Sequence, residues 1–394
     1  MVTKLHTFIE TKLLNSLKSR YFLIHCISLA WLSHILLAYP LWLPNLRSFP
    51  QIHATELPIF FSSFQRYFLY ILALFSLFIA NYNLRYYKIA ITIFLFVFFL
   101  TILEDINRLQ PYFYFYSLIF VSIALHIKIP KNSHIPINTY IKSIEIDLYV
   151  LLGACYFWSG IYKCNELFPN LIFNLLNRIT YLGTLLSKIP EETYYAISLF
   201  EILLGIWFFY LAITCSLGLI YFKKIKFWYI FLASLLHFSI ILILLLSKWN
   251  TIVITWNICI IVILILIFLN YKNDEIVVMK NNNFSKIKHL LFAFIVAILP
   301  ALHIFGLWDS YLSWELYSAN LSQKNYYFNN YQEYNEQKII PKQLLNSYKI
   351  IYYDKKQEKY YINISNWLMA ETRTSLYAEP RYIEKLLDSL ERKK

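Results

Sequence analysis

Charged residues are scarce in this chain. Only 15% of its 394 residues are Asp, Glu, Lys or Arg, whereas 59% are hydrophobic and the mean hydropathy is +0.49. A water-soluble fold of this length would need more charge on its surface than this composition supplies. The composition therefore excludes a soluble protein and predicts an integral membrane protein.

Cysteine pairs and common catalytic signatures are also missing. The five cysteines form no CxxC pair and four of them lie inside apolar runs, so neither a disulfide framework nor a metal site is predicted. No Gly-rich phosphate loop, HExxH or GxSxG motif is present, which leaves phosphoryl transfer and serine hydrolysis unsupported. The net charge of +13 comes from short basic clusters between apolar runs, as in the flanks of membrane spans, and does not predict nucleic-acid binding.

Nine apolar runs predict helices that cross the bilayer. They lie near residues 21–39, 67–81, 87–103, 111–127, 147–163, 193–222, 227–246, 250–270 and 288–306. Residues 1–20 precede them as an amphipathic cytoplasmic helix. Residues 307–394 follow as a polar tail, in which 349–353 and 359–364 predict a hairpin and the segments after Asn366 and Pro380 predict helices. The predicted fold is all-α, a polytopic transmembrane helix bundle over residues 21–306 with a small mixed C-terminal tail.

The basic residues in the short loops predict the orientation of the bundle. With the N-terminus in the cytoplasm, the inner side holds more than twice as many lysines and arginines as the outer side. Basic residues concentrate in cytoplasmic loops, so we expect a cytoplasmic N-terminus and an extracytoplasmic tail.

Several polar residues then share the outer half of the bilayer. Lys163 ends one span, Glu201 lies about 12 Å inside the next, and His237 is near the middle of the span after that. The same half holds an outer turn with Glu104, Asp105, Asn107, Arg108 and Gln110. It also holds a later polar group with Trp249, Asn250, Trp256 and Asn257. One cavity between the helices would collect them.

Each of these residues also has a structural interpretation. Lys163 is either an interfacial anchor beside Trp158 and Tyr162 or a lysine whose apolar surroundings favour a neutral, proton-abstracting amine. A functional role is favoured for Glu201, because ionisable groups inside spans are costly. His237 is a relay or an inter-helix hydrogen-bonding residue. The turn at 104–111 is part of a site or a solvated turn with a local ion pair.

The segment Tyr156-Phe157-Trp158-Ser159-Gly160-Ile161-Tyr162-Lys163 resembles the Tyr-Phe-x-x-Gly-x-x-Lys stretch of the vitamin K-dependent gamma-carboxylase superfamily, which includes the bacterial HTTM membrane proteins. The 104–111 turn resembles the Asp-x-x-Arg-x-Gln-Pro turn of related bacterial proteins. The resemblance covers residues 20–306 and implies a bacterial cytoplasmic-membrane location, with Lys163 as the base that deprotonates a reduced naphthoquinone. Glu201 and His237 would tune Lys163 or relay protons. The candidate quinone-binding residues are then Trp158, Tyr162, Trp249, Asn250, Trp256 and Asn257.

The leading hypothesis is a quinol-linked, carboxylase-like enzyme that modifies a peptide or small substrate. The carboxylases carry a large outer domain for their protein substrate, whereas this chain has only the short tail after Gly306, a departure that weighs against peptide carboxylation. The alternative is a non-catalytic accessory protein, similar to DoxX-type partners of redox or maturation systems. An enzyme predicts an apolar-walled cavity touching Lys163 and Glu201, whereas an accessory protein predicts an exposed patch around Trp308, Trp314 and Trp367. A transporter is the weakest reading, since the spans lack two-half symmetry and have few Gly or Pro breaks.

Overall fold

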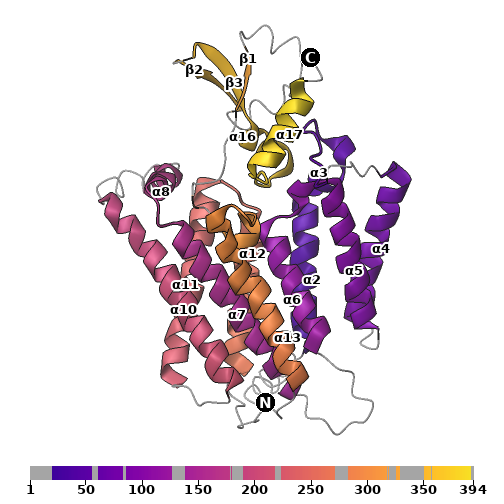
Figure 1. The fold of residues 1–394 in the computed structure, drawn as a ribbon, viewed down its shortest axis with the longest axis vertical. Helices are drawn as coiled ribbons and strands as arrows, with labels where there is room; N and C mark the ends of the chain where they lie inside the picture. Colours follow the sequence, from indigo (N-terminus) through magenta and orange to yellow (C-terminus); the bar gives the residue numbers. More distant parts are fainter. Residues whose placement is uncertain are drawn as a thin grey trace, which may run out of the picture.

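The computed structural model describes residues 20–55, 61–82, 86–126, 138–177, 179, 190–217, 223–270, 283–316, 318, 325–328, 350–355 and 357–391. Apart from Arg20, the amphipathic helix predicted for residues 1–20 lies outside this part of the chain. Described segments form a bundle of roughly aligned helices with the tail packed on one end (Figure 1).

Helices account for most of the described structure. Those of the bundle are α2 (Arg20–Leu37), α3 (Tyr39–Trp42), α4 (Ser63–Tyr82), α5 (Tyr87–Glu104), α6 (Pro111–His126), α7 (Asn138–Tyr162), α8 (Leu167–Asn177), α10 (Tyr195–Ser216), α11 (Lys223–Ser247), α12 (Val253–Asn270) and α13 (Asn283–Ala293). Short 3-10 turns lie at η1 (Pro44–Leu46), η2 (Ile106–Arg108), η3 (Glu191–Tyr194) and η7 (Tyr311–Ser313). Each of the nine predicted apolar runs coincides with a helix, whereas α8 was not predicted.

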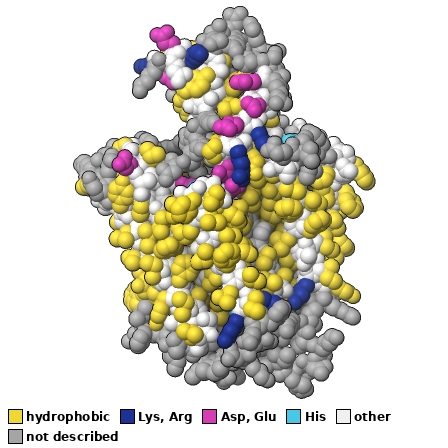
Figure 2. All heavy atoms as spheres, viewed as in Figure 1, with side chains coloured by type: hydrophobic (Ala, Val, Ile, Leu, Met, Phe, Trp, Pro, Cys, Tyr) yellow, Lys and Arg dark blue, Asp and Glu magenta, His cyan; other side chains and the backbone are white. Residues whose placement is uncertain are grey.

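Within the described residues, six helical segments are long and apolar enough to cross a membrane. They are Ser63–Tyr82, Tyr87–Glu104, Ser143–Tyr162, Tyr195–Ser216, Phe227–Ser247 and Lys286–Phe305. Figure 2 shows hydrophobic side chains covering the middle of the bundle, with basic side chains at the border away from the tail. The prediction of a polytopic, helical integral membrane protein is therefore confirmed. The count of nine spans stays a prediction, because α2, α6 and α12 have shorter apolar segments.

The last apolar segment is irregular near the tail. After α13 it becomes a π-helix, η5 (Phe294–Ile298), and then a 3-10 helix, η6 (Leu299–Phe305), which ends at Gly306 with a φ of 69°. Pro300 has no N–H and cannot bond the carbonyl four residues back, on Val296. Instead, the Val296 carbonyl accepts a bond from Trp314 Nε1 at 3.2 Å. A tail residue therefore satisfies the backbone group that the proline leaves free.

The described part of the tail contains a small sheet and two helices. Strands β1 (Asn325–Phe328), β2 (Ile351–Asp354) and β3 (Lys359–Asn363) form an antiparallel sheet in the order β1-β3-β2. The predicted hairpin is confirmed as β2 and β3, while β1 is an additional edge strand. Helix α16 (Ile364–Thr372) begins earlier than predicted, because the Asn363 side chain accepts a bond from Asn366 N at 2.9 Å and caps it. Helix α17 (Pro380–Glu391) begins at the predicted proline.

Candidate functional site

Helices α7 and α10 approach each other closely and bring Lys163 beside Glu201. An added Cβ on Gly205 of α10 would lie 2.5 Å from the backbone nitrogen of Phe157, and one on Gly160 of α7 would lie 2.7 Å from the Ser198 carbonyl. Small residues permit such backbone contact between membrane helices. The antiparallel pair therefore places the end of α7 next to the start of α10.

The Lys163 ammonium is buried and paired. Its Nζ donates to both Glu201 carboxylate oxygens at 2.6 Å and to Ser159 Oγ at 2.8 Å. Lys163 is 6% exposed and Glu201 is 5% exposed. An anchor would extend its charge towards water, whereas this ammonium is directed into the bundle. Desolvating both charges is costly, so the three short bonds are needed to hold the pair in place.

A second hydrogen-bonded chain runs through His237. Asn257 Nδ2 donates to the Val253 carbonyl at 2.8 Å, which orients the amide so that its oxygen faces His237 Nδ1 at 2.6 Å. His237 Nδ1 therefore carries a proton, and Nε2 accepts from the Tyr156 hydroxyl at 2.6 Å. The ring is fully used as one donor and one acceptor, in its neutral form.

These two groups line one cavity of about 60 Å³. Its polar wall consists of Tyr156, Ser159, Lys163, Glu201, His237 and Asn257. The rest of the wall is apolar or aromatic and includes Trp256, Leu236, Ile240, Val253, Ile260 and Leu316. Of the predicted site residues, Lys163, Glu201, His237, Trp256 and Asn257 thus meet at one place. The sequence analysis did not place Ser159 in the site, although its position four residues before Lys163 puts both on one helical face.

A larger cavity of about 160 Å³ adjoins the first on the tail side. Both cavities include Val253, Trp256 and Leu316 in their walls. The second adds predicted residues Gln110, Trp249 and Asn250 from the bundle, and Ser365, Met369, Ser375, Leu376 and Ala378 from the tail. The tail therefore covers the site at this end of the bundle.

Trp158 and Tyr162 face another direction. Trp158 Nε1 donates to the Ala297 carbonyl at 2.9 Å, and the Tyr162 hydroxyl donates to the Pro300 carbonyl at 2.9 Å. Both carbonyls belong to the irregular η5–η6 segment, where regular helical bonding is interrupted. The geometry gives these two aromatic residues a role in holding that segment against α7, outside the cavity walls.

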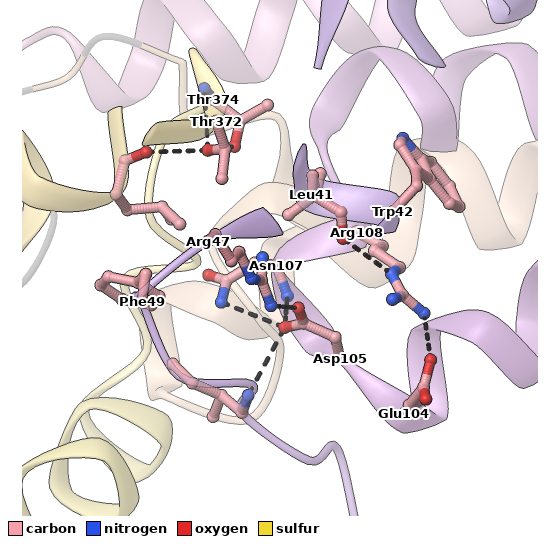
Figure 3. Close-up of polar contacts among 12 residues, drawn as sticks. Leu41, Trp42, Arg47, Phe49, Glu104, Asp105, Asn107, Arg108, Thr372 and Thr374 are labelled. Carbon is pink, nitrogen blue, oxygen red and sulfur yellow. Dashed lines mark hydrogen bonds and ion pairs between the residues drawn. The ribbon is translucent and has the colours of Figure 1, made fainter. Parts of the chain in front are cut away.

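The turn at 104–110 forms a separate buried cluster (Figure 3). Glu104 accepts from Arg108 Nη1 at 2.6 Å and from Arg66 Nη2 at 2.7 Å, and Asp105 pairs with Arg47. The interpretation as a solvated turn is wrong, because Glu104, Asp105 and Arg108 are at most 1% exposed. Its local ion pair does exist, but inside the protein.

This cluster also fastens the tail to the bundle. Asn107 Oδ1 accepts from Tyr377 N at 3.1 Å, and Gln110 Nε2 donates to the Ser375 carbonyl at 2.8 Å. Glu371 of α16 accepts from Phe49 N at 2.8 Å. The polar turn thus positions the tail segment that covers the larger, tail-side cavity.

Comparison with known proteins adds no family to this picture. No protein-family model, no curated protein and no solved structure matches the chain. The resemblance to the carboxylase superfamily therefore stays a prediction based on the segment ending at Lys163.

Proposed function

We propose that this chain is a membrane enzyme of the HTTM and gamma-carboxylase-like type, in which the Lys163–Glu201 pair acts as a general base. The observation that carries the proposal is the buried ammonium–carboxylate pair in the wall of a largely apolar cavity. Titratable pairs in such cavities are characteristic of catalytic sites. We place the cavity and the tail on the extracytoplasmic side of a bacterial membrane, in accordance with the loop charges.

The pair of the Lys163 ammonium and the Glu201 carboxylate can accept one more proton, on the carboxylate. When an acidic hydroxyl of a substrate transfers its proton to the pair, the O–H bonding electrons stay on the substrate oxygen. The pair then consists of an ammonium and a neutral carboxylic acid, with a net positive charge. That charge stabilises the new oxyanion in a region of low dielectric constant. His237, neutral and hydrogen-bonded to Tyr156, serves to position the polar wall.

A reduced naphthoquinone is the co-substrate implied by the resemblance, and the residues of the two cavities fit it. Trp256 is 6% exposed, and its Nε1 has no acceptor among the described residues although it borders both cavities. A ligand oxygen would satisfy this donor. The smaller cavity, at about 60 Å³, is well below the roughly 150 Å³ of a cavity that binds one benzene ring, so the bicyclic ring would extend into the tail-side cavity. When bound, the quinol supplies the acidic hydroxyl and the reducing equivalents.

The accessory-protein alternative has less support. It requires an exposed aromatic patch around Trp308, Trp314 and Trp367, yet Trp314 and Trp367 are each 0% exposed and packed in the core, and Trp308 is half-buried. The two tryptophans donate hydrogen bonds within the protein, Trp314 to Val296 and Trp367 to Glu371. The tail surface predicted to bind a partner is thus used to dock the tail itself.

Anaerobic titration of 1,4-naphthoquinol into the purified protein tests the proposal. Ultraviolet absorption distinguishes bound quinol from its anion, and tryptophan fluorescence reports binding. We expect the wild type to bind the quinol as its anion, and Lys163→Ala to bind it with at least about a tenfold smaller anion fraction, given the size of general-base effects. Lys359→Ala, the same change at an exposed lysine of β3, is the matched control. If the wild type binds the quinol without ionising it, the Lys163–Glu201 pair is not a general base. If the wild type does not bind the quinol, a quinol is not the co-substrate.

A further inference from the structure

A second buried polar group lies outside the proposed active site. His126 ends α6, Asp147 lies in the first half of α7, and His289 lies in α13. Asp147 and Lys163 are sixteen residues apart on α7, so this cluster is about 24 Å from the Lys163 cavity along the helix. None of the three residues takes part in the proposed reaction.

The three side chains converge on one point. His289 Nδ1 lies 2.6 Å from Asp147 Oδ1, and His126 Nε2 lies 2.9 Å from Asp147 Oδ2. One nitrogen or oxygen from each residue lies within 4.8 Å of the others. Ser122 Oγ donates to Asp147 Oδ2 at 2.7 Å and orients the carboxylate, as outer partners do for metal ligands.

Ordinary hydrogen bonding leaves this group incomplete. His126 Nε2 is buried and close to Asp147, but it is not aligned for a hydrogen bond, and His289 Nε2 has no partner among the described residues. Asp147 is 1% exposed inside a span, where a carboxylate needs compensation. Both imidazoles lie against this carboxylate, at 2.6 and 2.9 Å, and a divalent cation bound between the three residues would offset its charge.

We propose that His126, Asp147 and His289 bind a divalent first-row transition-metal ion such as Zn²⁺ or Fe²⁺. Two imidazoles and one carboxylate form a donor set typical of these ions. Ligand atoms around a tetrahedral ion with bonds of about 2.0–2.1 Å lie about 3.3 Å apart, so His289 and Asp147 must separate by about 0.7 Å.

The rings must also turn as the ion enters. They are stacked, with centroids 4.3 Å apart and planes 14° apart, so one imidazole rotates about its Cβ–Cγ bond to direct its lone pair at the ion. The Lys288 ammonium next to the site does not compete for Asp147, because it donates to the Leu125 carbonyl at 2.7 Å. The bound ion would join α6, α7 and α13 near the end of the bundle away from the tail.

Co²⁺ titration of the purified full-length chain tests the site. The protein carries no polyhistidine tag, is first treated with chelator, and is monitored by ligand-field absorption and by metal analysis after gel filtration. We expect one Co²⁺ per chain, with the spectrum of a nitrogen–oxygen site, displaced by Zn²⁺. In His126→Gln and His289→Gln, binding weakens at least about tenfold. Their amides can still donate to Asp147, so a merely hydrogen-bonding role would survive the change.

His25→Gln is the matched control, because His25 is an exposed histidine on α2 and should leave Co²⁺ binding unchanged. The proposal is overturned if the wild type shows no ligand-field bands, or if the variants at positions 126 and 289 bind as well as the control. Should either glutamine variant fail to fold, Co²⁺ binding is compared in the isosteric Asp147→Asn variant instead, and the wild-type spectrum shows which ligand atoms surround the ion. A wild-type spectrum without nitrogen ligands then refutes the site.

Discussion

The contact between Gly205 and the backbone of Phe157 makes a sharp prediction. In Gly205→Ala, the new Cβ would lie 2.5 Å from Phe157 N, 2.6 Å from its Cβ and 2.7 Å from its Cα. Two of these atoms are backbone, so no side-chain rotation relieves the clash. Ordinary contact at 3.4 Å requires α7 and α10 to separate by about 0.9 Å.

That separation would act on the Lys163–Glu201 pair. Bonds of 2.6 Å would lengthen to about 3.5 Å, the limit for a hydrogen bond. Overpacking costs about 1–3 kcal/mol, a weakened charged hydrogen bond costs about 1.5–3 kcal/mol, and alanine regains up to about 1 kcal/mol of helix propensity. We therefore expect a net loss of about 1.5–6 kcal/mol of unfolding free energy.

The assay combines unfolding in mild detergent with amine labelling read by mass spectrometry. Gly205→Ala should lower the free energy of unfolding and should raise the labelling rate of Lys163 relative to the exposed Lys359. Gly153→Ala is the control, because the nearest atoms to its new Cβ would belong to the Phe209 ring, at 2.8 Å and beyond, and a ring can rotate away. The reasoning is refuted if the two alanine variants are equally stable and Lys163 is equally unreactive in both.

Two further predictions concern buried groups. Lys163→Met or Glu201→Leu alone should cost about 3–5 kcal/mol of unfolding free energy, because each leaves an unpaired buried charge, whereas the double variant should cost less than either; additive losses would contradict the coupling. Tyr311 and Tyr377 lie where the tail meets the bundle, and burial raises the pKa of both above the ordinary value of 10.0. Because the folded-state pKa is raised, the protonated tyrosines stabilise the fold below pH 10. This stabilisation is lost as the pH rises from 10 towards the folded-state pKa, by about 1.4 kcal/mol of unfolding free energy per pH unit for each tyrosine. Unfolding measured between pH 9 and 11 should show this loss of stability with rising pH, and Tyr377→Phe should make the slope shallower by up to about 1.4 kcal/mol per pH unit; an unchanged slope would count against it.

The membrane character and the helices could be predicted because they depend on local composition. Each apolar run becomes a helix, since a backbone in lipid must satisfy its own hydrogen bonds. The cost of burying charge likewise marked Lys163, Glu201 and His237 as residues that need partners. The sequence also located the β2–β3 hairpin, whose strands pair across a short turn.

Other features depend on contacts that no local pattern records. Strand β1 needs a partner over thirty residues away, and the 104–110 turn is buried because both the tail and the segment that carries Leu41, Arg47 and Ile52 pack onto it. Trp158 and Tyr162 turn towards η5 and η6 because Pro300 interrupts the helix there.

By itself, the sequence determined that this protein is a helical membrane protein and which ionisable residues lie inside its spans. The tertiary structure alone decided which of them meet. The rotation of each helix about its axis is set by packing, such as the glycine contacts that join Lys163 to Glu201. The same packing gathers His126, Asp147 and His289 from three helices, although more than a hundred residues separate the last two. Which side chains come together depends on how the helices pack against one another. Helix propensity and hydropathy do not record this, because they are the same whichever helix lies beside a given face.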